Sequence, residues 1–302
     1  MKNQNRYTLL GGIIGDLAGS RFEHHPIKHK DFDLLVTGDF NISRGASIKD
    51  NSLASFFTDD TVMIIAVLRA LLESNEDYSN LEELTIRYMK DYGRRYPAVG
   101  YGHKFREWLH SPFCQPYYSF GNGSAMRVAP VAYFAKDLDE IKRLSKIVSS
   151  VTHNHPEGIK GAEAVASAIW LALHDKSKED ITSYIEANYY SLSFDYNDLV
   201  DHYSFDVTCQ NSVPQSIYAF LISNSVEDAI KTAISMGGDA DTMGSIAGAI
   251  AEAYYGVPEA LQQECREYLT PDIKYVLNNF YSYIKNNLSK TKLFKRNTDN
   301  DR

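Results

Sequence analysis

The run TDDTVMIIAVLRALLE at residues 58–73 indicates an α-helix with a polar start. Apolar residues recur along it at spacings of three and four, which is the helical period, at Val62, Met63, Ile64, Val67, Leu68, Leu71 and Leu72. Thr58 is a suitable N-cap, and carboxylates in the first turn suit the positive end of the helix dipole. Taken alone, the polar start is explained by helix capping.

The same period recurs through most of the chain. Helix-like segments lie at residues 81–92, 141–151, 161–173, 216–222, 229–236 and 245–255. Proline stands near the first position of several expected helices, at Pro156, Pro214, Pro258 and Pro271. Strand-like alternation is short and rare, around residues 34–36 and 192–194. The sequence therefore predicts an all-α fold, with more helices than a four-helix bundle.

No linker rich in proline, glycine or serine divides the chain. We therefore expect one compact domain over residues 1–288, followed by a polar tail at 289–302 that is frayed. Two stretches, 24–57 and 94–122, lack clear periodicity and are rich in glycine, proline, histidine, serine and aromatic residues. Long loops of this kind in a compact domain are often functional.

Composition narrows the class of protein. The 302 residues carry a net charge of -8, which argues against a broad nucleic-acid surface because such surfaces cluster lysine and arginine. The cysteines, Cys114, Cys209 and Cys265, are far apart and form no CxxC pair, so neither a disulfide framework nor a zinc-thiolate site is indicated. The start does not resemble a signal peptide, and no apolar run approaches the roughly 20 residues of a membrane helix. We expect a cytoplasmic protein, monomeric by default, with no membrane partner.

Two acidic segments stand near opposite ends of the chain. FTDDT occupies residues 57–61, and GGDADT occupies residues 237–242, again before a helix-like run. The second segment supplies more hard oxygen than capping needs, and its glycines allow a close backbone approach to a ligand. If the segments meet, their four carboxylates repel one another unless a cation neutralises them. Oxygen ligands of this kind suit Mg²⁺, Mn²⁺ or Ca²⁺ rather than zinc.

Three further segments carry polar or small residues in suggestive patterns. In GGIIGDLAGSRFE at residues 11–23, the small residues predict close helix packing, a buried Asp16 needs partners, and Glu23 either faces a cavity or is an exposed charge. SFGNGSAMR at 119–127 is either a plain turn or a phosphate cradle. VTHNHP at 151–156 places two histidines at a helix start, where a histidine contacts an anion or caps the helix.

These five segments, in this order, resemble the ADP-ribosylglycohydrolase family, which includes the dinitrogenase-reductase-activating glycohydrolase and the ADP-ribosyl-acceptor hydrolases. The resemblance runs from about residue 9 to 256. It implies an all-α fold with a centre of two divalent cations, Mg²⁺ or Mn²⁺. Half of the metal site would come from Thr58, Asp59 and Asp60, and the other half from Asp239, Asp241 and Thr242.

The resemblance also implies roles for ligand-binding residues. Glu23 falls at the position of a catalytic glutamate, and His153 at that of a histidine that contacts the ligand. The loop that would hold the ADP-ribose phosphates consists of Phe120, Gly121, Asn122 and Gly123, with Phe120 also near adenine. Ala240 replaces a threonine or serine of many relatives, but that side chain is not an expected ligand.

The expected function is metal-dependent hydrolysis of the N- or O-glycosidic bond between ADP-ribose and a modified protein or small molecule. Arginine is the preferred acceptor by analogy, while serine, a nucleobase, including one in ADP-ribosylated nucleic acid, and small molecules stay open. The alternative is a non-catalytic ADP-ribose binder or a crystallin-like structural relative, which is expected to have lost metal ligands. An unrelated Mg²⁺ phosphohydrolase would explain the carboxylates but not the Asn-Gly loop with His153.

Overall fold

The structure is a computed structural model that describes residues 4–37 and 54–299. Within these residues the chain forms fourteen α-helices and two short 3₁₀ helices, η1 and η2. Their bounds are η1 Gln4–Arg6, α1 Leu10–Gly19, α2 Asp59–Glu73, α3 Leu81–Arg95, α4 His103–His110, η2 Asn122–Ser124, α5 Val131–Phe134, α6 Leu138–Ser150, α7 Pro156–Leu173, α8 Lys178–Asn188, α9 Tyr196–His202, α10 Cys209–Ile222, α11 Val226–Ser235, α12 Ala240–Tyr255, α13 Glu259–Glu267 and α14 Pro271–Asp299.

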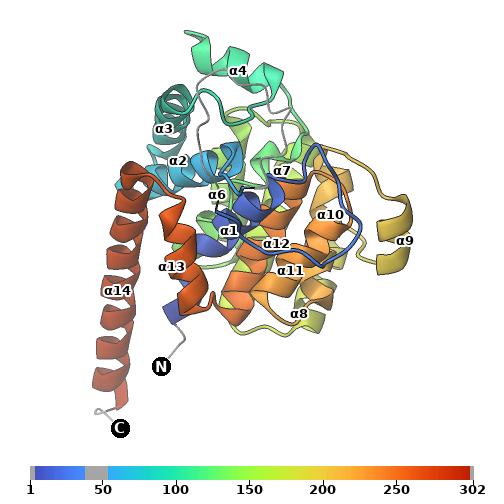
Figure 1. The fold of residues 1–302 in the computed structure, drawn as a ribbon. Helices are drawn as coiled ribbons and strands as arrows, with labels where there is room; N and C mark the ends of the chain where they lie inside the picture. Colours follow the sequence, from blue (N-terminus) through green and yellow to red (C-terminus); the bar gives the residue numbers. More distant parts are fainter. Residues whose placement is uncertain (1–3, 38–53, 300–302) are drawn as a thin grey trace.

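The antiparallel pair α1 and α12 forms the centre of the fold (Figure 1). Glycines at every fourth position of α1 lie against the backbone of α12. A methyl group on Gly15 would lie 2.0 Å from the carbonyl oxygen of Gly244, and one on Gly11 would lie 2.3 Å from that of Gly248. Because the backbones are in contact, no larger residue fits at these positions. The small residues of segment 11–23 thus place α1 directly on α12, as predicted.

A buried carboxylate fixes the register of these two helices. Glu252, near the end of α12, accepts hydrogen bonds from the backbone amides of Thr8, Leu9 and Gly11 at 2.6–2.7 Å, and from the Thr8 hydroxyl at 2.8 Å. These amides belong to the start of α1, where no intrahelical acceptor exists. A negative charge at this point also suits the helix dipole of α1.

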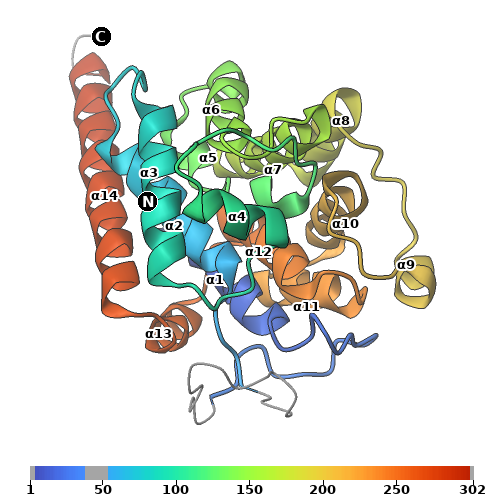
Figure 2. The same ribbon diagram turned by 90° about the horizontal axis from the view of Figure 1, so that it is seen from above.

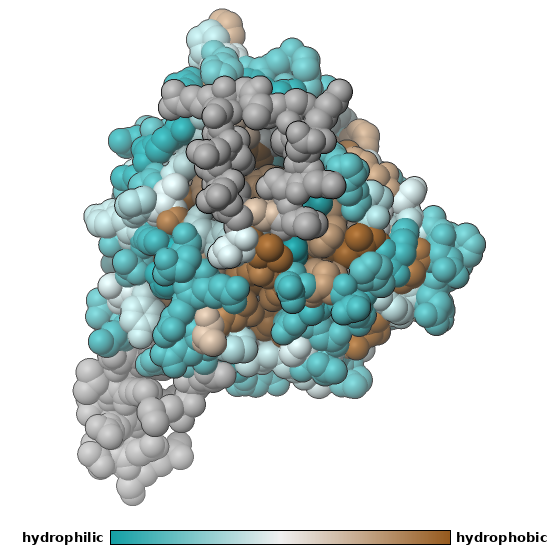
Figure 3. Space-filling view, viewed as in Figure 1, coloured by the Kyte–Doolittle hydropathy of each residue, from teal (hydrophilic) through white to brown (hydrophobic). Residues whose placement is uncertain are grey.

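The other helices surround this pair. Helices α7, α10 and α11 pack on further sides of α12, whereas α2 contacts α1, α3 and α14. Helix α14 lies along one side of the molecule, and α9 projects from the opposite side (Figures 1 and 2). On the face seen in Figure 1, hydrophilic residues cover most of the periphery and apolar residues show nearer the middle (Figure 3). None of the helices in the described ranges is long and apolar enough to cross a membrane.

The predicted all-α class is confirmed, and the differences are local. The strand-like segments 34–36 and 192–194 form no strand; the described residues contain only an isolated bridge between Gly121 and Thr208. The prediction that Pro214 lies near a helix start was wrong, because α10 begins at Cys209 and Pro214 is inside it. The Cys209 amide donates to the carbonyl of Phe120 at 2.9 Å, so a contact distant in sequence sets this helix start.

Parts of two predicted segments lie outside the residues that the structure describes. Residues 38–53 of the irregular stretch 24–57 lie outside the described residues, as do residues 300–302. Helix α14 continues to Asp299, through most of the segment expected to be a frayed tail. The fraying of residues 289–302 stays a prediction.

Candidate active site

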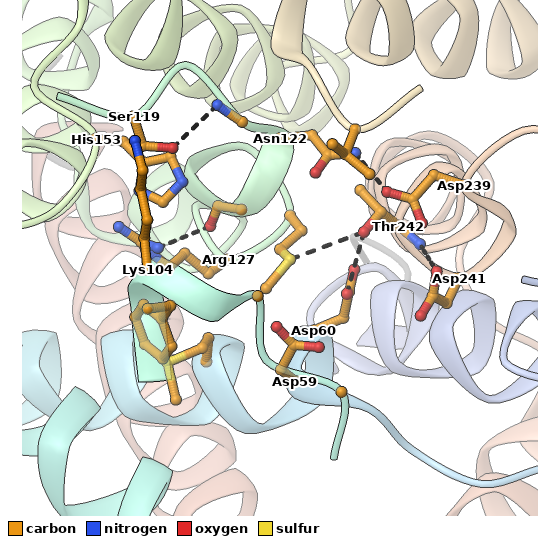
Figure 4. A pocket seen from close by; sticks show the side chains of 18 of the residues that line it. Asp59, Asp60, Lys104, Ser119, Asn122, Arg127, His153, Asp239, Asp241 and Thr242 are labelled. Carbon is orange, nitrogen blue, oxygen red and sulfur yellow. Dashed lines mark hydrogen bonds between the residues drawn. The ribbon is translucent and has the colours of Figure 1, made fainter. Parts of the chain in front are cut away.

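The two acidic segments meet in space. The hydroxyl of Thr242, in the first turn of α12, donates to Asp60 Oδ2 of α2 at 3.2 Å (Figure 4). Both residues are buried, with 4% and 1% of their surface exposed. Segments 57–61 and 237–242 therefore form one site, as the sequence led us to expect.

Asp16 of α1 holds the first acidic segment in place. Its carboxylate accepts hydrogen bonds from the Thr58 amide at 2.9 Å and the Thr58 hydroxyl at 2.7 Å, and also from the amide and hydroxyl of Thr61. The Thr58 hydroxyl in turn accepts a hydrogen bond from the Asp60 amide, so Thr58 is the N-cap of α2. Asp16 thus has the partners that a fully buried carboxylate needs.

The second acidic segment is oriented by a turn and an asparagine. Gly237 has φ 72°, a left-handed conformation that suits glycine, and Asp239 is the N-cap residue of α12. The side-chain amide of Asn122 donates to Asp239 Oδ2 at 2.7 Å. Asn122 therefore orients a predicted metal ligand, whereas the resemblance placed it among the residues that bind phosphate.

Glu23 faces these carboxylates. One oxygen from each of Glu23, Asp239 and Asp241 lies within 4.8 Å of the other two. Burial, followed by the charges of Asp241 and Asp16, raises the pKa of Glu23 to about 8. Burial, followed by the charge of Asp241, raises the pKa of Asp59, Asp60 and Asp239 well above the ordinary value. The chain alone therefore does not balance the negative charge of this site.

The donor set fits divalent cations. Asp60 Oδ1 is buried and has no hydrogen-bond partner among the described residues. Within the same residues, no lysine or arginine forms an ion pair with Asp59, Asp60, Asp239 or Asp241. A buried carboxylate oxygen without a donor is costly, and a cation would satisfy it. Carboxylate and hydroxyl oxygens are the ligands of Mg²⁺ and Mn²⁺.

These residues line one end of a pocket of about 440 Å³. Glu23, Asp59, Asp60, Asp239 and Asp241 make this end acidic. The opposite side carries Ser119, Lys104, Arg127 and His153 (Figure 4). The pocket is thus divided into an acidic half and a half with cationic and neutral donors, so it suits a ligand that has a metal-binding group and an anionic group.

Most of the loop of residues 121–123 is occupied by internal hydrogen bonds. The Gly121 amide donates to Ser119 Oγ at 3.2 Å, and the Asn122 amide donates to the Val207 carbonyl at 2.8 Å. No described hydrogen bond uses the Gly123 amide, at the start of η2. A methyl group on Gly123 would lie 3.2 Å from His153 Nε2, so the loop and the histidine approach closely. Of the three expected phosphate donors, Gly123 is the one that these bonds leave for a ligand.

His153 is held neutral and oriented. It is 5% exposed, and burial, followed by the charge of Arg127, lowers its pKa well below the ordinary value. The Thr152 hydroxyl accepts from an Arg127 guanidinium nitrogen and lies 2.7 Å from His153 Nδ1. The Tyr117 hydroxyl is also hydrogen-bonded to Thr152. Because Tyr117 can donate to the Thr152 oxygen, we assign the Thr152 proton to the bond with Nδ1. His153 Nε2 then carries a proton that it can donate toward the pocket.

A family profile described as ADP-ribosylglycohydrolase matches residues 2–291, nearly the whole chain. The chain belongs to the ADP-ribosylglycohydrolase family. This confirms the resemblance drawn from the five motifs, and it identifies the protein as a glycohydrolase.

The relatives of this ADP-ribosylglycohydrolase agree with the assignment. The human ADP-ribosylhydrolase ARH3 is 28% identical, in a region covering 89% of this chain and 90% of the relative. The ADP-ribosylarginine hydrolase Tri1 of Pseudomonas putida (strain GB-1) is 27% identical and covers 83% of this chain and 70% of the relative. A solved structure titled ADP-ribosylglycohydrolase-related protein complex has a TM-score of 0.65 at 21% identity, covering 93% of this chain and 97% of the other, so it shares the fold.

Two predicted site residues of the ADP-ribosylglycohydrolase do not line the pocket. Thr58 is buried against Asp16, and Phe120 is 44% exposed, with its ring 5.2 Å from that of His155. The alternative of a buried core Phe120 is therefore wrong, while its proposed contact with adenine stays a prediction. The other predicted site residues line the pocket: Glu23, Asp59, Asp60, Gly121, Asn122, Gly123, His153, Asp239, Asp241 and Thr242.

Sequence reasoning missed several residues of this ADP-ribosylglycohydrolase pocket. Lys104, Tyr117 and Arg127 line it without having been assigned a role. The first two lie in the irregular stretch 94–122, which was expected to be functional as a whole, and Arg127 ends the motif at 119–127. No spacing rule singles out these side chains, because their place in the pocket depends on how separate helices pack.

Proposed function

We propose that the protein removes ADP-ribose from a modified acceptor by hydrolysis that depends on two divalent cations, Mg²⁺ or Mn²⁺. The observation that carries this proposal is the single pocket in which Glu23 and the convergent aspartates face a half with anion donors. A ribose bound at the acidic end would place the diphosphate toward Gly123 and His153. The non-catalytic alternative is not favoured, because Glu23 and the aspartates are all present.

In this proposal the aspartates of α2 and α12 hold the cations. Asp59 and Asp60 contribute from one side and Asp239 and Asp241 from the other. The cations would orient the 2′ and 3′ hydroxyls of the ribose and polarise a water molecule. Asp16, Thr61 and Asn122 keep these carboxylates in position through the hydrogen bonds described above. Thr58 was also predicted to be a ligand. Its hydroxyl donates to Asp16 and accepts from the Asp60 amide, so in this proposal Thr58 would hold Asp60 in place from outside the pocket lining.

Glu23 would move the proton. The bond from the ribose anomeric carbon to the acceptor breaks, and the oxygen of water forms the new bond to that carbon. Cleavage of such a bond passes through an oxocarbenium-like state, which nearby carboxylates stabilise. Glu23, ionised when cations offset the surrounding charge, would take a proton from water and pass that proton to the leaving acceptor. Without cations, burial and the charges of Asp241 and Asp16 raise the pKa of Glu23 to about 8, and cations beside these carboxylates would lower it.

We propose arginine as the preferred acceptor. Support comes from the Pseudomonas relative, whose name states ADP-ribosylarginine as its substrate. The name of the human relative states no acceptor. Serine, a nucleobase and small molecules therefore stay open as alternatives, and serine is the one compared below.

The test is hydrolysis of two matched peptides. Purified protein is incubated with an ADP-ribosyl-arginine peptide or an ADP-ribosyl-serine peptide, with Mg²⁺, with Mn²⁺ or with EDTA, and released ADP-ribose is measured by mass spectrometry. We expect release that EDTA abolishes and that is faster from arginine. Equal release in EDTA would refute the metal requirement, faster release from serine would refute the acceptor preference, and no release from either peptide would contradict arginine and serine alike.

A further inference from the structure

The cationic half of the pocket contains two permanent positive charges, and one of them is committed to the protein itself. Arg127 is 1% exposed and donates to the Gly123 carbonyl and to Thr152 Oγ1, both at 2.8 Å. Arg127 Nε has no hydrogen-bond partner among the described residues. No carboxylate of those residues forms an ion pair with the Arg127 guanidinium. The Arg127 charge therefore contributes an uncompensated positive field, while most of its donors hold the loop.

Lys104 is the other permanent charge. It lies in the first turn of α4, lines the pocket and is exposed. Within the described part of the chain, no residue forms a hydrogen bond or ion pair with its amino group. In Figure 4 the side chain extends from α4 on the side that carries Ser119 and His153, away from Asp241. Its amino group is thus available to a ligand, in contrast to the guanidinium of Arg127.

We propose that Lys104 binds the diphosphate of the ligand directly, from the α4 side of the pocket. This inference rests on the proposed function and names a contact that the five motifs do not contain. Lys104 would face the Gly123 amide and His153 Nε2 across the bound diphosphate. The ligand would then be held between two elements, η2 and α4.

Charge balance supports this assignment. A diphosphate diester carries two negative charges, whereas the neutral His153 and a single backbone amide offer dipoles only. The buried Arg127 offsets part of that charge without contact. A lysine ammonium on a flexible stem is a common phosphate ligand, because it acts as a point charge with three donors. Lys104 supplies the remaining positive charge at the position where it can reach the anion.

The test is ADP-ribose affinity, measured by titration calorimetry in Mg²⁺ at low and high NaCl. Lys104→Gln should weaken ADP-ribose binding about tenfold, the scale of one charge-assisted contact. The variant should also show a weaker dependence of Kd on salt, because one ion pair with the phosphates is lost. Lys104→Arg should restore affinity to within about twofold, since it keeps the charge.

Arg106→Gln is the matched control. Arg106 is an exposed cation on the same helix that does not line the pocket, so its loss should leave ADP-ribose affinity unchanged. Wild-type affinity and salt dependence in Lys104→Gln, or an equal loss in Arg106→Gln, would overturn the contact while leaving the proposed function intact. If the wild-type protein bound no ADP-ribose, both the proposed function and this inference would fail.

Discussion

At the scale of single residues, Glu23 combines proximity to the carboxylates proposed to hold the cations with partial access to solvent. Its carboxylate lies within 4.8 Å of Asp239 and Asp241, and its side chain is 29% exposed. Asp16, which holds the segment of Asp59 and Asp60 in place, is instead fully buried and hydrogen-bonded. An acid group in contact with both the charged cluster and the pocket is suited to proton transfer.

Replacing Glu23 by glutamine separates proton transfer from binding. Glutamine keeps the shape of the side chain but cannot carry the proton, so we expect turnover of the ADP-ribosyl peptide to fall roughly 10²–10⁴-fold. ADP-ribose affinity should change little. Single-turnover rates and calorimetry measure the two quantities, with the exposed neighbour variant His25→Gln as the control. Unchanged turnover in Glu23→Gln would remove Glu23 from the reaction.

At the scale of elements, the contact of α1 with α12 positions the site. Asp16 is on α1, Asp241 and Thr242 are on α12, and the glycines between the helices set their separation. Glu252 joins the opposite end of the pair through the first amides of α1. A change in the distance between these helices would therefore move Asp16 relative to Asp241, and with it the segment that Asp16 holds.

Two alanine variants of α1 test this packing. In Gly15→Ala the new methyl group would lie 2.0 Å from the Gly244 carbonyl oxygen, so we expect a loss of about 3 kcal/mol or more in unfolding free energy. Gly12→Ala places its methyl group 3.4 Å from its nearest neighbours, and alanine has the higher helix propensity, so stability should change by less than about 1 kcal/mol. Urea unfolding measures both, and equal stability of the two variants would contradict the close-packing role of Gly15.

At the scale of the whole molecule, folding brings together carboxylates that are far apart in the unfolded chain. Burial and neighbouring charges raise the pKa of Glu23 to about 8 and that of Asp16 to about 7. Each of these groups binds its proton more tightly in the folded state, so its contribution to stability is lost as pH rises toward the folded pKa. His153 acts in the opposite sense, since its lowered pKa makes its contribution complete above about pH 6.5.

The metal-free protein should therefore lose stability between about pH 6.5 and about pH 8.5. We expect the unfolding free energy to fall by about 1 kcal/mol or more, because each pKa unit of difference corresponds to about 1.4 kcal/mol. Mg²⁺ should restore more stability at the higher pH, where the carboxylates have released their protons. Thermal unfolding with EDTA or Mg²⁺ at both pH values measures this. A metal-free Tm that is constant or rises over this range would show that ionisation of these carboxylates does not lower the stability of the protein.

The amino-acid sequence by itself determined the elements and the identity of the acidic segments. Helical periodicity predicts α2, Thr58 is the N-cap that its residue type suggests, and the spacing of Gly11 and Gly15 predicts a close helix contact. These features follow from local backbone chemistry, which needs no knowledge of distant residues. The five motifs, in their order along the chain, were sufficient to indicate the family.

The tertiary structure alone decided how the residues of the site are used. Asn122 orients Asp239, Asp16 holds Thr58, and Lys104 reaches the pocket from a helix that carries none of the motifs. Pro214 lies inside α10, and the first amide of this helix, that of Cys209, bonds to Phe120, a partner outside the helix. Each of these arrangements is a hydrogen bond or contact between residues distant in the chain. Such contacts exist only after the helices pack, so no local pattern encodes them.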